Sequence, residues 1–145
     1  MNTEMKMNDQ AIDVLARTLW GEARGEGMAG QIAVGHVIRN RVNDGKDKSW
    51  WGEGYIGVCL AKWQFSCWNA NDPNYSYLSG KKDIPAAQYA QAREAALIVM
   101  QNQQPDPTGG ATHYYVATMK NPPNWRTNAT RTCMIGSHVF FKNVP

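Results

Sequence analysis

The segment LWGEARGE, residues 19–26, lies between two stretches of helical periodicity and places two glutamates at their junction. Before it, apolar side chains recur at spacings of three and four, which predicts an amphipathic helix capped by Asn8 or Asp9. We expect this helix to end at about Glu22, because the glycines of the segment weaken it. A second helical pattern then continues to a turn at 43–45. The sequence therefore predicts two tightly joined helices around the glutamates.

The rest of the chain alternates between irregular and regular patterns. Residues 46–82 are rich in Trp, Gly, Asn and Pro without a stable period, which predicts a long irregular segment with short helices. Asp83 is suited to cap a third helix, which continues to about residue 103 and is ended by Pro105. Residues 111–116 and 138–142 have the β-branched and aromatic side chains that are typical of strands. We therefore predict an α+β fold that is mainly helical with a small antiparallel sheet.

Length and composition restrict the class of protein. The 145 residues predict a single domain, residues 1–145, in which residues 1–8 form a flexible N-terminal extension. No apolar run approaches the roughly 20 residues of a membrane-spanning helix, so we expect no stable membrane insertion. The N-terminal residues lack the apolar core of a secretory signal, so we expect synthesis in the cytoplasm. A net charge of +3 is too small for the basic stripe of a nucleic-acid-binding protein.

Glu22 is the strongest candidate for chemistry. It lies seven residues after Leu15 and three after Leu19, so a helix places its carboxylate on the apolar face. Burial there disfavours the charged form and raises the pKa, which gives the protonated carboxyl that a general acid needs. If the helix continued to Glu26, the two carboxylates would lie roughly 6 Å apart and each would oppose ionisation of the other. The alternative is that both glutamates are solvated at a frayed helix end, with Arg24 between them.

Five sequence blocks occur in the order found in a known family: LWGEARGE, GQIAVGHVIRNRV, QFSCWN, DPTGGATHYY and IGSHVFFK. Together they resemble the catalytic domain of the spore-cortex-lytic cell-wall hydrolases, which also occurs in bacteriophage endolysins. The resemblance covers roughly Ile12 to Lys142. It implies a lysozyme-like fold and cleavage of peptidoglycan between N-acetylmuramic acid and N-acetylglucosamine. It also implies that Glu22 is the catalytic residue and that no cofactor or metal takes part.

The resemblance implies a mechanism that needs one carboxyl group. Similar members are lytic transglycosylases, in which one Glu acts as acid and then as base while the muramic 6-hydroxyl attacks and forms a 1,6-anhydro product. In this scheme Glu26 would orient the substrate or hold the loop through Arg24. A hydrolysing muramidase is the alternative, and it needs a second carboxylate about 5–5.5 Å or 6.5–9.5 Å away. Asp72 is the candidate for that carboxylate, although a role in the turn at 71–73 explains it better.

Two further blocks supply candidates for binding sugar. The first offers amide, hydroxyl and ring surfaces that would line the glycan cleft: Gln64, Phe65, Ser66 and Trp68. Core packing explains its two rings equally well. The second lies at the start of a predicted strand, where a sugar can approach the backbone closely: Gly110, Ala111, His113 and Tyr115. Strand alternation puts Tyr114 on the opposite face, so we expect only Tyr115 of the two tyrosines to face the cleft. Trp125 would either stack at the rim or cover the core.

Two other functions fit parts of the sequence. A zinc-dependent peptidoglycan amidase or peptidase would draw on His36, His113, His138, Cys67 and Cys133, but no HExxH or CxxC spacing supports it. A non-catalytic cell-wall binding module would use the many Trp and Tyr side chains. Three cysteines, Cys59, Cys67 and Cys133, cannot all pair within one chain, and free thiols are expected in the cytoplasm. A bridge between Cys59 and Cys67 stays open.

The resemblance also sets expectations for partners and location. The expected partner is the glycan strand of bacterial peptidoglycan, and we expect a monomer. By resemblance the chain is a phage endolysin, which is made in the host cytoplasm and acts on the cell wall or periplasm after the membrane is breached. A bacterial housekeeping or prophage enzyme is the alternative. The positive net charge would favour approach to an anionic wall.

Overall fold

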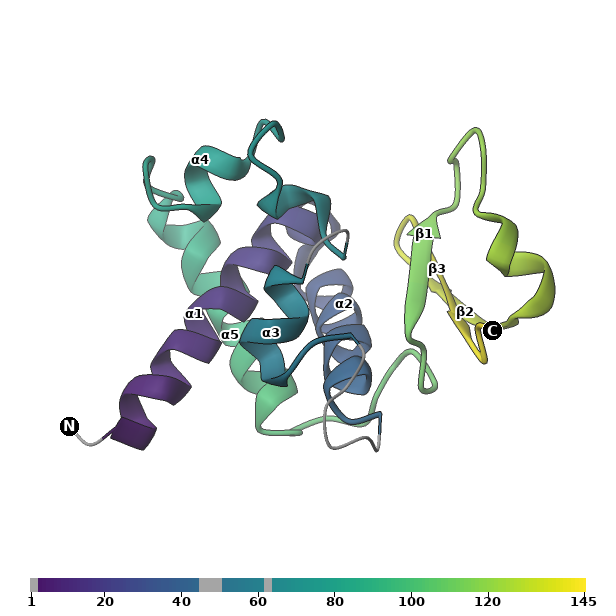
Figure 1. The fold of residues 1–145 in the computed structure, drawn as a ribbon, viewed down its shortest axis with the longest axis horizontal. Helices are drawn as coiled ribbons and strands as arrows, with labels where there is room; N and C mark the ends of the chain where they lie inside the picture. The colour runs from purple at the N-terminus through teal and green to yellow at the C-terminus, as the bar shows by residue number, and fades with distance from the viewer. Residues whose placement is uncertain (1–2, 45–50, 62–63) are drawn as a thin grey trace.

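The computed structural model describes residues 3–44, 51–61 and 64–145. Its helices, including the short 3₁₀ turns η1 to η3, are α1 (Thr3–Ala23), η1 (Arg24–Glu26), α2 (Gly27–Val42), α3 (Gly54–Leu60), η2 (Ser66–Trp68), α4 (Tyr75–Leu78), α5 (Ala86–Met100) and η3 (Asn124–Asn128). Its strands are β1 (His113–Val116), β2 (Thr130–Ile135) and β3 (His138–Lys142). The sheet lies to one side of the helices (Figure 1). The predicted α+β architecture, mainly helical with a small antiparallel sheet, is confirmed.

The helices differ from the prediction mainly at their ends. The first begins at Thr3, so the predicted start at Asn8 or Asp9 is wrong, and residues 3–8 of the predicted flexible extension are helical. No glycine or proline interrupts this region, so nothing stops the helix from extending towards the N-terminus. The predicted cap at Asp83 is also wrong. The backbone of Pro85 is extended (ψ 131°), and proline disfavours helical geometry in the residue before it, so α5 starts only at residue 86.

The C-terminal ends of the helices and the central segment agree better with the sequence prediction. The second helix ends at Val42, as predicted. The predicted third helix ends at Met100 rather than near residue 103, because Asn102 has a left-handed backbone (φ 52°). Short helices occupy the described part of the segment predicted to be irregular.

The sheet contains one strand that the sequence did not predict. Its strand order is β1-β3-β2, and both neighbouring pairs are antiparallel. The missed strand, β2, shows no alternation of polar and apolar side chains, and none of its residues is buried. It is joined to β3 by a short turn at Gly136, whose positive φ of 58° favours glycine. Because β3 is central, β1 is an edge strand.

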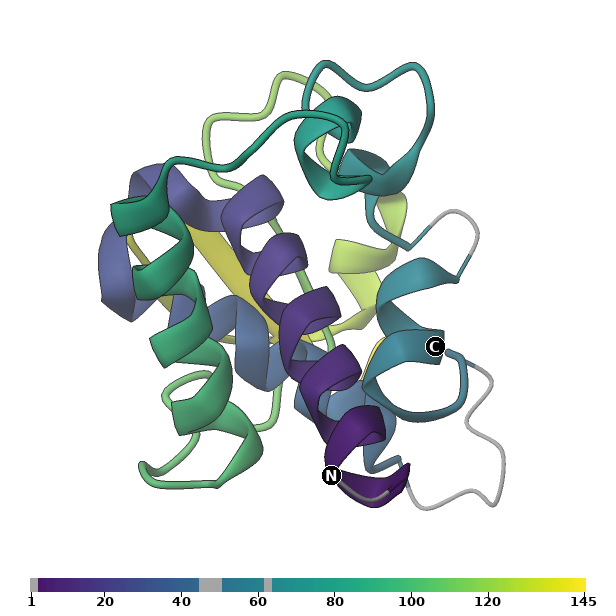
Figure 2. The ribbon, with the colours of Figure 1, turned by 90° about the vertical axis from the view of Figure 1, so that its left-hand side faces the viewer.

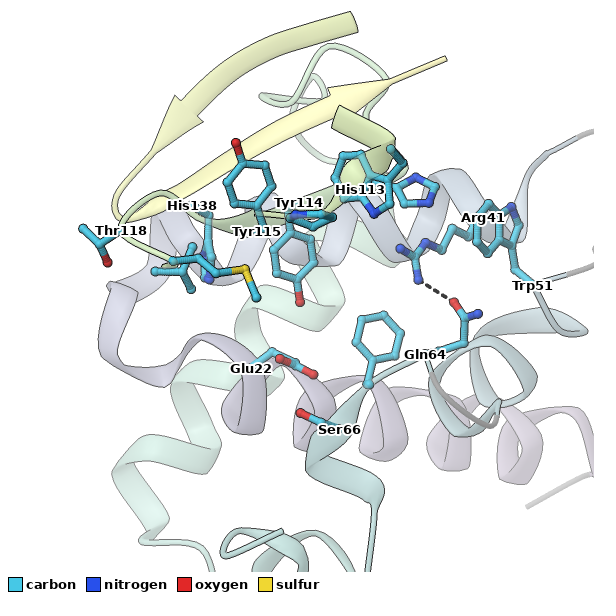
Figure 3. A pocket seen from close by; sticks show the side chains of 15 residues that line it. Glu22, Arg41, Trp51, Gln64, Ser66, His113, Tyr114, Tyr115, Thr118 and His138 are labelled. Carbon is cyan, nitrogen blue, oxygen red and sulfur yellow. Dashed lines mark hydrogen bonds between the residues drawn. The ribbon is translucent and has the colours of Figure 1, made fainter. Parts of the chain in front are cut away.

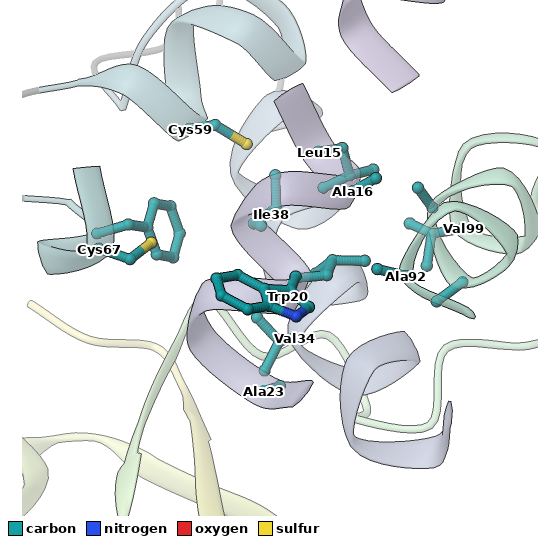
Figure 4. Packing of buried hydrophobic residues seen from close by; sticks show 14 of the residues in the cluster. Leu15, Ala16, Trp20, Ala23, Val34, Ile38, Cys59, Cys67, Ala92 and Val99 are labelled. Atoms are coloured by element: carbon teal, nitrogen blue, oxygen red, sulfur yellow. The ribbon is translucent and has the colours of Figure 1, made fainter. Parts of the chain in front are cut away.

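Two apolar clusters hold the layers together. The larger one lies among α1, α2, α3 and α5, and Figure 2 shows α1 between α5 and α3. Its buried side chains include Leu15, Ala16, Trp20, Ile38 and Val99 (Figure 4). A smaller cluster of Ala33, Val37, Ala111 and Phe140 joins α2 to the sheet. Thus α2 is buried on both sides and fixes the sheet relative to the end of α1. Among the described helices, none combines the length and apolar character needed to span a bilayer.

Gly21 allows α1 to lie against η2 directly beside Glu22. A Cβ atom at position 21 would lie 2.8 Å from the Cβ of Cys67 and 3.3 Å from Cδ1 of Leu78. We expect Gly21→Ala to lower the free energy of unfolding, because shifting the packed turn costs about 1–3 kcal/mol. The loss would exceed the gain of about 1 kcal/mol that alanine brings as a better helix former. Unfolding in denaturant measures the difference.

Gly25→Ala is the matched control for this prediction. Apart from its chain neighbours, no atom of the described residues lies within 4 Å of a Cβ placed at position 25, so this variant should be at least as stable as the wild type. Equal stability of the two alanine variants would contradict the close packing at Gly21.

Candidate active site

A cavity of about 810 Å³ lies between the end of α1, residues 64–66 and the sheet (Figure 3). Glu22 lies at its helical side. The opposite side is formed by side chains of β1 and by Trp125 of η3. The cavity therefore forms where the second apolar cluster holds the sheet against the helices.

Glu22 is partly buried in this cavity, in the last turn of α1. Burial raises its pKa above the ordinary range, and the nearby charge of Asp72 acts in the same direction. The hydrogen bond from the Cys67 thiol (Sγ to Oε1, 3.6 Å), the nearby Tyr114 hydroxyl and the charge of Arg41 partly oppose this shift in the pKa. The raised pKa predicted from helix periodicity is therefore confirmed, and the carboxyl can hold a proton beside the cavity.

Glu26 does not pair with Glu22. The chain tightens into η1 after Ala23, which turns the Glu26 side chain towards the β2–β3 turn. There it accepts hydrogen bonds from the backbone N–H of Ser137 (3.3 Å) and from the Ser137 hydroxyl. The hydroxyl bond lowers the pKa of Glu26, so the predicted mutual opposition of the two carboxylates does not arise.

Arg24 does not hold Glu26 either. Its guanidinium lies over the Trp20 ring at 4.2 Å and donates to Oδ1 of Asn74 at 3.2 Å. It thus joins the helix end to the loop before α4, outside the cavity lining. The suggestion that Glu26 holds the loop through Arg24 is wrong.

The 64–68 segment divides between cavity and core. Gln64, Phe65 and Ser66 line the cavity, as predicted. Trp68 does not, because its indole Nε1 donates to Oγ1 of Thr18 at 2.8 Å and its ring packs on the helical core. For Trp68, packing against the core is therefore the correct interpretation.

The sequence interpretation missed Arg41. Its buried guanidinium lines the cavity and donates to Oε1 of Gln64 at 2.5 Å and to the carbonyl of Thr112 at 2.7 Å. It also lies 4.7 Å from the Trp51 ring. In the sequence, the one sign of a special role was that Arg41 falls at helical spacing from apolar residues of the second helix. Arg41 thereby fixes the amide of Gln64 at the cavity wall.

The strand block divides in the same way. His113 and Tyr115 line the cavity, as predicted. Gly110 and Ala111 do not: the N–H of Gly110 donates to Asp106 at 3.0 Å, and Ala111 is fully buried, with its carbonyl accepting from Asn40. The backbone approach predicted at these two positions is therefore wrong, since both are used to anchor the start of β1.

The two adjacent tyrosines both line the cavity, so the expectation that only Tyr115 would do so is wrong. They do point to opposite faces, as alternation requires: Tyr115 packs on Phe141, whereas Tyr114 packs on Phe140 and His138. The Tyr114 hydroxyl points towards Glu22 (Figure 3). Because β1 is an edge strand, the cavity reaches around it and meets both faces.

Aromatic rings form one wall of the cavity. The ring of His113 lies 5.2 Å from that of Trp51 and 4.9 Å from that of Trp125, measured between centroids. Tyr115 lies 5.9 Å from Trp125. Burial lowers the pKa of His113 to about 4, so this ring is neutral at neutral pH. Such a wall suits stacking against the apolar face of a sugar ring.

The other candidates have structural roles. Asp72 accepts the N–H of Asn74 at 2.9 Å, which confirms its role in a turn. The three cysteines are free. His36 is buried in α2, 3.9 Å from Asp106. Among the described residues, no group of three or more His, Cys, Asp or Glu side chains is placed to hold a metal ion. The zinc alternative therefore gains no support from the described residues.

Comparison with known proteins identifies similar sequences. The Cell Wall Hydrolase family model matches residues 25–141. A spore cortex-lytic enzyme of Halalkalibacterium halodurans is 30% identical over 143 residues, which cover 96% of this chain and 37% of that protein. A spore cortex-lytic enzyme of Oceanobacillus iheyensis is 27% identical over 146 residues, which cover 98% of this chain and 45% of that protein. The chain thus spans about two fifths of the length of these curated relatives.

Two solved structures have a similar fold. The catalytic domain of the germination-specific lytic transglycosylase SleB from Bacillus anthracis matches with a TM-score of 0.66 and 27% identity, covering 91% of this chain and 93% of that chain. The catalytic domain of the Bacillus cereus SleB protein matches with a TM-score of 0.68 and 27% identity, covering 92% and 91%. These similarities confirm the lysozyme-like α+β fold expected from the sequence.

Proposed function

Because this chain belongs to the cell wall hydrolase family, we propose that it cleaves the glycan strands of peptidoglycan as a lytic transglycosylase, between N-acetylmuramic acid and N-acetylglucosamine. The observation that carries the proposal is the partly buried Glu22, whose raised pKa allows it to hold a proton at the cavity. Of the described residues, Glu22 is the one carboxylate that lines the cavity. The matched family range begins after Glu22, so this residue's role rests on its surroundings.

A single carboxyl group suffices for this reaction. Protonated Glu22 would give its proton to the glycosidic oxygen as the bond from the muramic C1 breaks. The resulting carboxylate would then take the proton of the muramic 6-hydroxyl as that oxygen bonds to C1, which closes a 1,6-anhydro ring. Because the substrate supplies the nucleophile, the second carboxylate of a hydrolysing glycosidase is not needed.

The remaining cavity residues would bind the glycan. The ring wall of Trp51, His113 and Trp125 would stack on one sugar, and the Gln64 amide held by Arg41 would meet the hydroxyl groups of another. In its biological setting we infer a phage endolysin that reaches the wall from the host cytoplasm. We infer that it acts as a monomer and that its binding partner is peptidoglycan, with neither nucleic acid nor membrane insertion involved. The net charge of +3 supports this approach to an anionic wall.

Mass spectrometry of the fragments released from purified cell walls tests the function. We expect 1,6-anhydro-muramic ends and intact peptides. Reducing ends would instead indicate a hydrolysing muramidase, and new free amino groups on an intact glycan would overturn the proposal in favour of an amidase or peptidase. Faster release from vegetative walls than from spore cortex would support the endolysin setting, and release from cortex alone would contradict it.

A further inference from the structure

The surroundings of Glu26 are shaped for its side chain. A Cβ atom at Gly136 would lie 2.5 Å from Oε2 of Glu26, and one at Gly30 would lie 2.3 Å from its Cβ. Ser137 donates to the carboxylate through both its backbone N–H and its hydroxyl. Two positions without side chains and two hydrogen bonds thus fix a carboxylate that does not line the cavity.

His138 connects this carboxylate to the cavity. Its Nδ1 lies 3.7 Å from Oε1 of Glu26, and that buried nitrogen has no hydrogen-bond partner among the residues that the structure describes. The same ring lines the cavity that holds Glu22 (Figure 3). It packs edge-on against the ring of Tyr114 at 4.9 Å, and the hydroxyl of Tyr114 points towards Glu22 (Figure 3). A line of contacts therefore runs from Glu26 through His138 and Tyr114 to the proposed acid.

Charge decides which nitrogen of His138 holds the proton. The hydrogen bonds from Ser137 lower the pKa of Glu26, so the Glu26 carboxyl group is an anion at neutral pH. Burial lowers the pKa of His138, although the charge of Glu26 acts in the opposite direction, so the ring is neutral and has one N–H. A bare Nδ1 lone pair facing the anion would be repelled, whereas an Nδ1–H would be attracted. The proton therefore belongs on Nδ1, and Nε2 keeps its lone pair.

We propose that Glu26 holds His138 with its proton on Nδ1, so that Nε2 accepts a hydrogen bond from a hydroxyl or acetamido N–H of the sugar bound beside Glu22. Glu26 is then a positioning residue that acts through His138. The identity of the ligand as a sugar rests on the proposed function. The tautomer rests only on the contacts of the chain itself.

Nitrogen NMR of the imidazole ring tests the tautomer without any substrate. We expect the wild type to show a protonated Nδ1 and an unprotonated Nε2 at neutral pH. In Glu26→Gln the preference should weaken or reverse, because the anion is gone. Glu94→Gln is the matched control, since Glu94 is exposed on α5 and the same change there should leave the spectrum unaltered. A wild-type ring protonated on Nε2 would overturn the inference, whether or not the Glu26 variant folds.

A second measurement tests the contact with sugar. Soluble, uncross-linked peptidoglycan strands added to the non-cleaving Glu22→Gln variant should shift the Nε2 resonance of His138. His138→Phe should raise KM about tenfold, as expected for one lost hydrogen bond, and His138→Gln should recover most of that loss. An unmoved resonance together with an unchanged KM in His138→Phe would overturn the contact. If the wild type released no glycan fragments, the proposed function would fail, while an Nδ1–H tautomer that depends on Glu26 would still support the positioning role.

Discussion

Replacing Glu22 by glutamine is expected to slow the release of glycan fragments by about 10³-fold, as the loss of a general acid typically does. Glutamine keeps the size and shape of the side chain but has no proton to give at the pH where the cavity works. The ring wall and the Gln64 amide are unchanged by this substitution, so binding to cell walls should persist. Turbidity loss and fragment release measure cleavage, and sedimentation with purified walls measures binding.

The stability of this variant separates lost chemistry from lost structure. Burial raises the folded-state pKa of Glu22, so the wild type loses stability as the pH rises from the unfolded-state value through the folded-state value. Above that window Glu22→Gln should be at least as stable as the wild type, because it has no carboxylate to desolvate. Glu94→Gln, the same change on the exposed face of α5, should keep full activity. If the Glu22→Gln variant kept activity within tenfold of the wild type, Glu22 would not be the general acid. If the wild type bound cell walls without cleaving them, the result would favour a non-catalytic binding module.

The position and the raised pKa of Glu22 could be predicted because helix periodicity is local. Once Leu15 and Leu19 are known to face the core, the direction of the side chain at 22 follows from 3.6 residues per turn. Gln64, Ser66 and His113 were found because they lie in the sequence blocks that resemble the family and carry side chains suited to binding sugar. Two of the three strands, β1 and β3, were likewise visible through their side-chain composition.

Residues whose role depends on distant segments could not be predicted in this way. Tyr114 was assigned to the far side of its strand, because alternation gives the two faces and does not say that the cavity reaches around a sheet edge. Arg41 was missed because its partners, Gln64 and Thr112, lie on segments far from it along the chain. The role of Glu26 was predicted from its distance to Glu22 along the chain. Its actual partners, Ser137 and His138, lie more than a hundred residues later.

Replacing Tyr114 by phenylalanine should lower the cleavage rate by about 10- to 100-fold, the usual cost of one hydrogen bond to a charged group. The Tyr114 hydroxyl points towards Glu22 (Figure 3) and lowers the pKa of that carboxyl. Its strongest contribution comes when Glu22 gives up its proton, because the hydroxyl can then donate a hydrogen bond to the forming carboxylate. Without it the pKa of Glu22 rises, so the alkaline limb of the pH–rate profile should move to higher pH. Rates measured across that limb check both effects.

Tyr115→Phe is the matched control, since it removes the same hydroxyl from the adjacent residue, which packs on Phe141 on the other face of the strand. It should leave the alkaline limb where it is, even if sugar binding weakens. Phenylalanine at 114 retains the ring that packs on Phe140 and His138, so a change in unfolding midpoint should be small. If Tyr114→Phe slowed cleavage without moving the limb, the hydroxyl would be acting on the sugar and not on Glu22. If the two variants moved the limb equally, the Tyr114 hydroxyl would not be what sets it, because of these two tyrosines it is Tyr114 whose hydroxyl points towards Glu22 (Figure 3).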